Sequence, residues 1–511
     1  MSSTDTGVPS PQTRAESTAY EHTSRHSDVI AFIDALAARR DPRLVVREFG
    51  TSPEGRSFPL LILSAHGHFT PEEAHGSGLP VVLVINGIHA GEVEGKEGCL
   101  MLVRDILDGR DTAVGGEAPD LLASMTLVVV PLFNPDGNDR IDPAHRKLDV
   151  ARFSGQLGPT SGVGTRTTAA GINLNRDYLR QDAPEMRLLQ EHVARPWNAH
   201  LVIDTHATNG SIHRFALTYD IPHTAHSGRA EPVEYMRDRL LPAVTRAVKA
   251  NAGLDTFYYG NFLRDEGGQG AGWITYTHHP RFGGNYRGLT GRLDLLLETY
   301  AYLPFKERVE TTYAFLRETL HYTAAHGPAI VELLENCRAP RDRIAVRYRL
   351  EALAGEPVTV LTREPYTLEG NPSEARVPHL ARFVPEHEVD RPYAYAVPAA
   401  IAERLRGHGF EPQDPTPGRS YDVEVAIVRG SVTSAGREIL EANASSYLDA
   451  VYARSRRTIP IGWKLVPTAV PLGAVAVYLC EAGSDDGLVP CGWIPEPAAG
   501  EEFPAWRVLE G

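Results

Sequence analysis

Two residues three positions apart, His89 and Glu92, form the first pattern in the chain that can do chemistry. An imidazole and a carboxylate at this spacing lie on the same side of a helical turn, where both can bind one divalent ion such as zinc. They follow residues 79–87 (LPVVLVING), a continuous apolar run that predicts a buried strand. Ligands bind beyond the carboxyl ends of strands in open α/β sheets, so this position favours a metal site over a surface pair.

A third ligand candidate, His206, follows the predicted strand at residues 200–205 (HLVIDT). A single histidine at a strand end is more often structural, but a third ligand is what the first pair lacks. Two histidines and one glutamate leave one coordination position open, as in catalytic zinc sites. We therefore expect one zinc ion per chain on His89, Glu92 and His206.

Glu298 lies near the end of a mostly apolar predicted strand, residues 293–300 (LDLLLETY). Such a carboxylate is either half of an ion pair at the strand end or a base whose pKa is raised by partial burial. Hydrolysis at a metal centre needs a carboxylate that takes a proton from water and delivers it to the leaving nitrogen. The metal ligand set therefore favours Glu298 as the catalytic base.

Asn175 and Arg176 lie in residues 171–178 (GINLNRDY). The rigid fork of an arginine fits a carboxylate through two hydrogen bonds, and an asparagine amide can add another. The alternative is a surface loop closed by an ion pair between Arg176 and Asp177. The sequence alone leaves both interpretations open.

The motifs occur in one order along the chain, namely HAGE at 89–92, NPDG at 134–137, NRD at 175–177, DTH at 204–206 and LLLETY at 295–300. As a set they resemble the zinc carboxypeptidase family M14, the carboxypeptidase A type. The resemblance covers about residues 45–325. It implies zinc on the three ligands already named, with Glu298 acting first as general base and then as general acid. It also implies that Asn175 and Arg176 hold the free C-terminal carboxylate of a substrate.

The resemblance implies two further substrate contacts. The family uses an arginine downstream of NPDG to polarise the scissile carbonyl; Arg146 fits its spacing best, and Arg140 and Arg166 remain alternatives. The family also has a mobile tyrosine upstream of the glutamate, which Tyr276 or Tyr286 could supply.

One position departs from the family pattern. Two residues before the Asn of the Asn-Arg pair the family commonly has an aspartate that is hydrogen-bonded to the first histidine ligand, whereas this chain has Asn173. A neutral amide oxygen accepts the same hydrogen bond more weakly than a carboxylate. We therefore expect Asn173 to support His89 and zinc to be held less tightly than with aspartate.

The elements that position these residues alternate between strands and helices, which predicts an α/β fold with a mainly parallel mixed sheet flanked by helices. Residues 45–67 are expected to form a hairpin and residues 305–336 a long helix. After about residue 340, short strand patterns separated by Pro and Gly predict a second, β-rich domain. We expect a disordered tail at 1–27, a zinc carboxypeptidase-like catalytic domain at 28–340 and a β-rich accessory domain at 341–511.

The charge and the cysteine content of the chain limit the kinds of partner and site that we expect. The chain has 511 residues and a net charge of −14, without basic runs, so nucleic acid and membrane surfaces are not expected as partners. Its four cysteines lack CxxC spacing, which argues against a disulfide framework and a cysteine zinc site. The polar N-terminus lacks an apolar signal segment, and we expect a cytoplasmic protein.

The resemblance predicts a zinc metallocarboxypeptidase, a hydrolase that cleaves an amide bond next to a free carboxylate with a metal-activated water. Its substrate would be a peptide or small amide with a free carboxylate. Two alternatives remain. One is a small-molecule deacylase or amidohydrolase of the aspartoacylase or succinylglutamate desuccinylase type, and the other is a catalytically inactive binding protein on the same fold. The long segment between NPDG and NRD favours the peptidase, and an intact Glu298 beside three intact ligands argues against the inactive protein.

Overall fold

The computed structural model describes residues 10–110, 120–208, 210–263, 271–434 and 445–510. Its largest sheet has eight strands in the order β1-β2-β4-β3-β5-β10-β6-β7. These are β1 (Leu44–Thr51), β2 (Ser57–Leu63), β4 (Thr126–Val130), β3 (Val81–Asn86), β5 (Leu201–Thr208), β10 (Leu293–Tyr300), β6 (Leu217–Asp220) and β7 (Thr256–Tyr258). Parallel pairs join β4, β3, β5 and β10 at the centre, and antiparallel pairs attach β2 on one side and β6 on the other. The predicted α/β fold with a mixed sheet is confirmed, as is the hairpin of β1 and β2.

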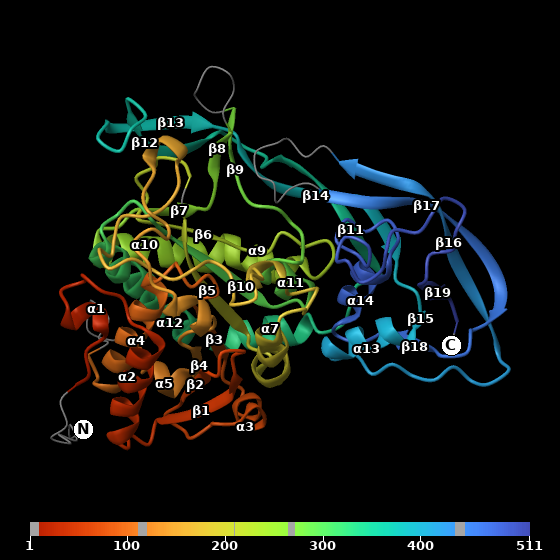
Figure 1. The fold of residues 1–511 in the computed structure, drawn as a ribbon, viewed down its shortest axis with the longest axis horizontal. Coiled ribbons are helices and arrows are strands. Elements are labelled where there is room, and N and C mark those ends of the chain that lie inside the picture. The colour runs from red at the N-terminus through yellow and green to blue at the C-terminus, as the bar shows by residue number, and fades with distance from the viewer. Residues whose placement is uncertain (1–9, 111–119, 209, 264–270, 435–444, 511) are drawn as a thin grey trace.

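The central strands are buried on both faces because helices cover the sheet from both sides (Figure 1). All six residues of β3 are buried, in agreement with its continuous apolar sequence. One face packs against α2 (His26–Ala38), α4 (Glu94–Leu107), α10 (Leu241–Ala252) and α12 (Phe305–Asn336). The other face packs against α3 (Pro71–Gly76), α7 (Pro184–Leu189) and α11 (Gly283–Leu289). The bounds of α12 confirm the predicted long helix.

Short helices fill the connections. They are α1 (Arg14–Ser17), α5 (Leu121–Ser124), α6 (Pro135–Asp139), α8 (Arg195–Trp197) and α9 (Ala230–Tyr235), with the 3-10 turns η1 (Val150–Arg152) and η2 (Leu174–Arg176) and the π-helical turns η3 (Gln190–Ala194) and η4 (Met236–Leu240). Within the described ranges, no helix combines the length and the apolar character needed to cross a membrane.

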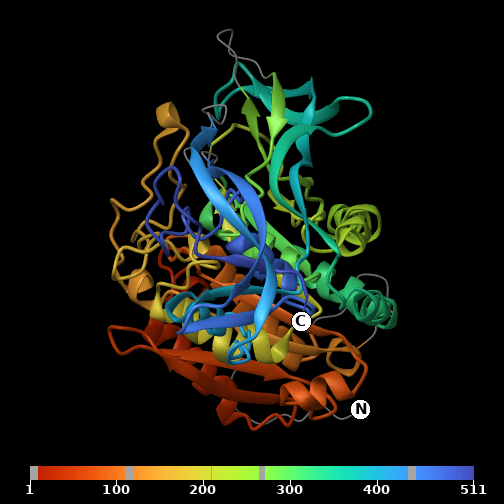
Figure 2. The ribbon, with the colours of Figure 1, turned by 90° about the vertical axis from the view of Figure 1, so that its right-hand side faces the viewer.

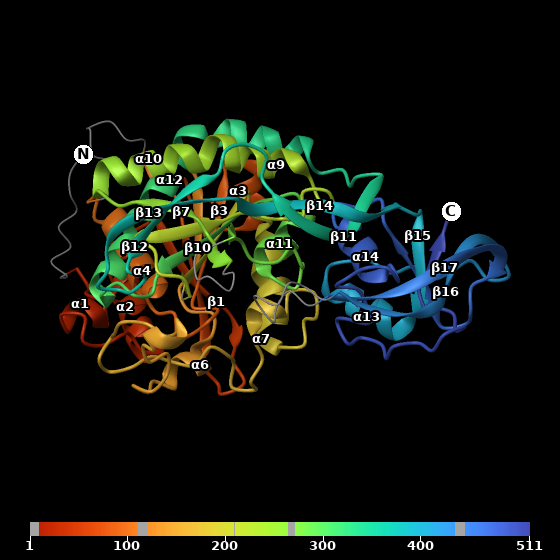
Figure 3. The ribbon, with the colours of Figure 1, turned by 90° about the horizontal axis from the view of Figure 1, so that it is seen from above.

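The C-terminal part contains a five-stranded sheet in the order β17-β16-β19-β15-β18, which faces the viewer in Figure 2. Its strands are β15 (Ala394–Pro398), β16 (Ser420–Ser434), β17 (Ser445–Thr458), β18 (Trp463–Pro467) and β19 (Trp506–Val508), and its helices are α13 (Ala399–Gly407) and α14 (Gly473–Cys480). Figure 3 shows this part beside the part that contains the eight-stranded sheet, with α13 and α14 on the side toward α7 and α11. The β-rich character expected after residue 340 is therefore present.

A second sheet contains strands from both sides of residue 340. Its order is β11-β14-β9-β8, formed by β8 (Asn261–Leu263), β9 (Gly272–Ile274), β11 (Arg343–Ala352) and β14 (His379–Asp390). The hairpin of β12 (Val358–Glu364) and β13 (Asn371–Val377) projects over the part that contains the eight-stranded sheet (Figure 1). Arg214 N donates to the carbonyl of Leu361 at 3.0 Å in this contact. The domain limits 28–340 and 341–511 remain predictions, and these contacts join the two segments.

The N-terminal segment differs from its prediction. Residues 10–27 contain α1, whose first turn is closed by a capping box between Thr13 and Glu16. The Thr23 hydroxyl and the Ser24 backbone N–H donate to the buried carboxylate of Glu97 on α4, at 2.9 and 2.6 Å. Because these hydrogen bonds hold the segment against α4, the expectation of a disordered tail is wrong for residues 10–27. Residues 1–9 lie outside the described residues.

Candidate active site

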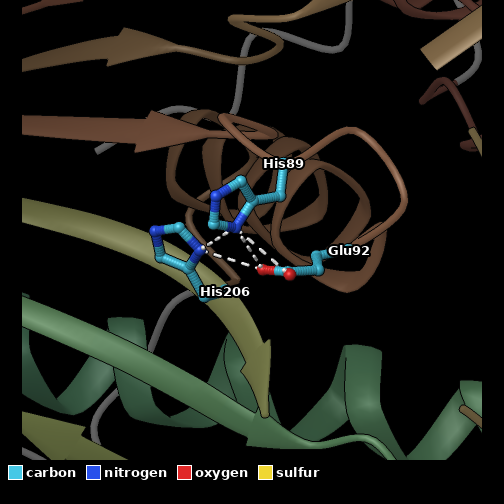
Figure 4. A group of neighbouring side chains, drawn as sticks. All are labelled: His89, Glu92 and His206. Carbon is cyan, nitrogen blue, oxygen red and sulfur yellow. Dashed lines mark hydrogen bonds and ion pairs between the residues drawn. The ribbon is translucent and has the colours of Figure 1, made fainter. Parts of the chain in front are cut away.

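Three side chains from two strand ends converge at the edge of the central sheet (Figure 4). His89 and Glu92 lie in the turn between β3 and α4, and His206 lies in β5. The Nδ1 atoms of His89 and His206 are 3.0 Å apart. Glu92 Oε2 is 3.2 Å from Nδ1 of His89 and 2.9 Å from Nδ1 of His206. The structure therefore brings the three predicted metal ligands together.

The outer nitrogen of each imidazole faces a second polar group. Nε2 of His89 lies 3.0 Å from Oδ1 of Asn173, the neighbour expected from the sequence. Nε2 of His206 lies 3.3 Å from Oδ1 of Asp204, a residue that the sequence analysis did not single out. Asp204 precedes His206 by two positions on one strand, so both point to the same face, and that spacing could have revealed it. With the outer nitrogens engaged, both Nδ1 atoms can present a lone pair to one ion beside a carboxylate, and this donor set fits zinc.

Charges around the ligands shift their pKa values. Burial lowers the pKa of His89 to about 3, which favours the neutral imidazole. Burial also disfavours the charged form of His206, but the carboxylates of Asp204 and Glu92 outweigh it and raise the pKa to about 10. Burial opposes ionisation of Glu92, but His89 and Arg146 hold the pKa of its carboxyl well below the usual range. The centre is thus a carboxylate surrounded by positive charge.

Of the three arginines proposed to polarise a carbonyl, two reach this centre. Arg146 and Arg166 each donate from Nη1 to Oε1 of Glu92 at 3.0 Å. A side chain at Gly91 would bring its Cβ to 2.8 Å from Cδ of Arg146, so the glycine of the HAGE motif makes room for this arginine. Arg146 is the more buried, with its side chain 13% exposed against 43% for Arg166.

Arg140 does not lie in the site, and this candidate is wrong. Its Nη2 pairs with Oε1 of Glu54 at 2.7 Å, and its side chain is 44% exposed. The surface carboxylate of Glu54 satisfies this guanidinium away from the metal ligands.

Glu298 lies on β10 directly opposite His206 on the parallel neighbour β5. Burial raises the pKa of its carboxyl to about 8, and the carboxylate of Glu92 adds to the shift while His206 opposes it. A carboxylate with a raised pKa beside a metal site suits the transfer of a proton at neutral pH. The register of the two strands thus places the predicted base next to the third predicted ligand.

Asn175 and Arg176 lie in the turn η2 and border the same pocket. Oδ1 of Asn175 accepts a hydrogen bond from the backbone N–H of Gly283 at 3.0 Å, which orients its amide. The guanidinium of Arg176 lies 3.6 Å above the ring of Phe282, and burial lowers its pKa to about 9. Among the described residues, no carboxylate forms an ion pair with Arg176. The carboxylate of Asp177, its alternative partner, instead accepts backbone N–H groups of Asp182 and Ala183.

The two candidate tyrosines, Tyr276 and Tyr286, lie in different surroundings. Tyr276 is buried and lines the pocket, 5.5 Å from the ring of Phe282. Tyr286 is wrong as a substrate contact, because its hydroxyl is 2.8 Å from Nδ1 of His408. It lies on the face of α11 that packs toward the C-terminal part, in the hydrophobic core.

The pocket that contains these groups has a volume of about 340 Å³. Eight of the predicted site residues line it, namely His89, Glu92, Arg146, Arg166, Asn175, Arg176, Tyr276 and Glu298. The rest of the lining is Asp204, Ala207, Thr208, Tyr259, Thr277, Phe282, Gly284, Asp294 and Leu296. A larger cavity of about 850 Å³ lies beside Tyr286 and Phe410, and its lining includes none of the three metal ligands. The pocket at the metal ligands is therefore the candidate active site.

The comparisons agree with this assignment. Residues 29–217 match the family described as zinc carboxypeptidase, which confirms the resemblance for the segment that holds the three metal ligands, Asn175 and Arg176. Carboxypeptidase 2 of Trichophyton rubrum is 28% identical over 170 residues, which are 33% of this chain and 26% of that protein. The match thus spans about a quarter of the length of that curated relative. The family match and this partial match to a curated relative together support a metallopeptidase role.

Among solved structures, a metallo-carboxypeptidase from Burkholderia cenocepacia is 18% identical, with a TM-score of 0.39, over 59% of this chain and 70% of that chain. Carboxypeptidase A from Helicoverpa armigera is 16% identical, with a TM-score of 0.36, over 60% of this chain and 74% of that chain.

Proposed function

We propose that the protein is a zinc metallocarboxypeptidase that hydrolyses an amide bond next to a free carboxylate. The observation that carries this proposal is one pocket with three parts. These are a convergent set of two histidines and a glutamate, a carboxylate at Glu298, and a guanidinium at Arg176 without an acidic partner among the described residues.

His89, Glu92 and His206 would hold the zinc ion, with Asn173 and Asp204 orienting the imidazoles. When bound, the ion would supply a Lewis acid that polarises the amide carbonyl and activates water. The Nδ1 atoms and Oε2 of the three residues already face one another, so little rearrangement is needed to bind it.

Four side chains of the protein have distinct roles in the proposed reaction. Arg176 and the amide of Asn175 bind the free carboxylate and fix the position of the terminal residue. Glu298 takes a proton from the attacking water as the new C–O bond forms, and it delivers that proton to the nitrogen as the C–N bond breaks. The guanidinium of Arg146 stabilises the negative charge that develops on the carbonyl oxygen.

The test uses purified protein reconstituted with zinc and a panel of N-blocked dipeptides, each with a free or an amidated C-terminus. We expect hydrolysis of the free acids, loss of activity with a chelator, and little turnover of the amides. Hydrolysis confined to N-acylated single amino acids would favour the deacylase. No hydrolysis by the zinc-loaded protein, or equal hydrolysis of acids and amides, would contradict the proposal.

A further inference from the structure

The larger cavity, with a volume of about 850 Å³, lies at the end of the central strands opposite to the metal ligands. It is lined by Val202, the second residue of β5, and by Arg292, the residue before β10, whereas His206 lies near the other end of β5. The C-terminal part closes it with Phe410, which follows α13, and Val470, which precedes α14. A cavity of this volume is in the range that small organic molecules occupy in proteins.

Arg287 on α11 lies between the larger cavity and the active-site pocket. It lines the larger cavity, and its Nε donates to Oδ2 of Asp294, which lines the active-site pocket. Its Nη1 donates to the hydroxyl of Tyr178 at 2.8 Å, which also holds the guanidinium in place. Val202 and Asp204 are two residues apart on β5, so the two spaces lie one behind the other on one face of the sheet. A ligand in the larger cavity would therefore not meet the metal ligands.

Arg292 gives the larger cavity a cation without a partner. Its Nη1 atom is buried and has no hydrogen-bond partner among the described residues. Glu335, whose carboxylate attracts this guanidinium, is paired with Arg338 at 2.6 Å. His200 is neutral, because burial lowers its pKa to about 3 and the charge of Arg292 adds to the shift. Burial of a charged group costs free energy unless an opposite charge lies beside it, so this position favours an anion.

The other charged side chains of the cavity leave its buried end positive. Arg195 lines the cavity as well, and its Nε donates to the backbone carbonyl of Gln190 at 3.1 Å rather than to a carboxylate. Glu191 and Glu411 also line the cavity, but both are exposed. Solvent and salt screen exposed charges much more than buried ones, so these two carboxylates offset the charge of Arg292 only weakly.

We propose that the larger cavity binds an organic carboxylate with an apolar body, whose carboxylate group lies against Arg292. The fork of a guanidinium binds a carboxylate through two hydrogen bonds, and its single charge matches a carboxylate better than a dianionic phosphate. Tyr286, Leu334 and Phe410 supply buried apolar surface for the body of the ligand. The inference goes beyond the proposed function, because this binding needs neither zinc nor catalysis.

Calorimetry with phenylacetate tests this binding, with and without zinc. Under the proposed function Arg176 binds carboxylates in the active-site pocket, so the measurement uses the full chain with Arg176→Ala. We expect one equivalent of phenylacetate to bind, and phenylacetamide, which has a similar shape without the charge, should bind about 10-fold more weakly. Acetate, which lacks the apolar body, should also bind more weakly. No binding of phenylacetate, equal affinity for the amide, or tighter binding of phenyl phosphate would overturn the proposal.

Three further changes, each made in the Arg176→Ala protein, locate the bound molecule. Arg292→Gln removes the charge and should weaken the binding of phenylacetate by about 10-fold, with little change for phenylacetamide. Arg338→Gln is the matched control, because Arg338 lines the same cavity but is exposed and paired with Glu335, and it should change the affinity little. Val470→Trp keeps Arg292 and fills the cavity from its half-buried wall, so it should weaken the binding of both molecules. It tests the inference even if Arg292→Gln does not fold.

The outcomes separate this inference from the proposed function. Unchanged affinity for phenylacetate in Arg292→Gln, or in Val470→Trp, would overturn the inference, and so would an equal loss in Arg292→Gln and Arg338→Gln. Because the measurement involves no hydrolysis, a protein that binds phenylacetate through Arg292 but cleaves no peptide would refute the proposed function and leave the inference intact.

Discussion

Two buried clusters in this protein have the same composition, two histidines and one carboxylate. One contains His89, Glu92 and His206, and the other contains His278, His279 and Asp485. In the second cluster both oxygens of the carboxylate are engaged: Oδ2 of Asp485 is 2.7 Å from Nε2 of His278, and Oδ1 accepts from the hydroxyl of Tyr478 at 2.7 Å. This network ties α14 and the C-terminal part to the segment after β9. The same residue types therefore form the proposed metal centre in one place and a hydrogen-bonded network that joins two parts of the chain in the other.

The difference lies in what surrounds each cluster. Two members of the first cluster, His89 and Glu92, line a pocket together with an acid-base candidate, Glu298, and with Arg176, an arginine without an acidic partner among the described residues. Beside the second, Arg281 is already paired with Asp486, at 2.6 Å. Histidine and carboxylate are thus insufficient to define a metal site, and the open position and the groups around it decide the function.

Metal content gives the largest expected difference between the clusters. His89→Ala and His206→Ala should each lose the single zinc ion that we expect in the unmodified protein, because two remaining ligands hold zinc weakly. His279→Ala is the matched control and should keep it. Metal analysis after dialysis measures the ratio of zinc to protein. Full zinc in His89→Ala together with loss of zinc in His279→Ala would exchange the roles of the two clusters.

Glu298→Gln should lower kcat by a factor on the order of 10² to 10⁴ while zinc and substrate still bind, because it removes only the proton transfer. Steady-state kinetics and metal analysis of the same preparation measure both properties. Turnover close to that of the unmodified enzyme would remove Glu298 from the mechanism and weaken the contrast between the clusters.

Arg176→Ala should raise KM for substrates with a free carboxylate by about 10- to 100-fold and change kcat less, because the group that it binds does not react. Arg140→Ala, which changes an exposed arginine paired with Glu54, serves as the control and should alter neither constant. An equal loss with C-terminally amidated substrates would show that Arg176 does not recognise the carboxylate.

Asn173→Asp should have the smallest effect, a tightening of zinc by roughly 10-fold, because a carboxylate holds the outer N–H of His89 more strongly than an amide does. A more basic His89 also makes the ion a weaker Lewis acid, so the acid limb of the kcat/KM profile should move to higher pH. Competition with a chelator and a pH profile measure the two effects. If neither changes, the contact between Asn173 and His89 does not tune the metal centre.

The sequence predicted those parts of the site that depend on local spacing. HxxE at His89, the strand ending at His206 and the carboxylate of Glu298 follow from short patterns, and the parallel sheet brings them together. The apolar periodicity of residues 305–336 likewise predicted α12, because a buried helix stripe is a local property.

The errors concern partners that only the tertiary structure supplies. Arg140 has the right type and region, but Glu54 from the loop between β1 and β2 pairs with it. Tyr286 lies near the pocket in sequence, but His408 of the C-terminal part holds its hydroxyl. Residues 10–27 have a polar composition typical of a tail, and the buried carboxylate of Glu97 gives them a place to bind. No local pattern contains these distant partners.

The strand pairing between β9 and β14 has a practical consequence for dissecting the chain. A fragment that stops near residue 340 keeps β8 and β9 but loses β14, which pairs with β9 at Trp273 and Ile274. The fragment would expose the unpaired backbone of a sheet edge beside an indole that is fully buried in the intact chain. Open edges of this kind promote association of one chain with another. We therefore expect a fragment that ends near residue 340 to self-associate more readily than the intact chain.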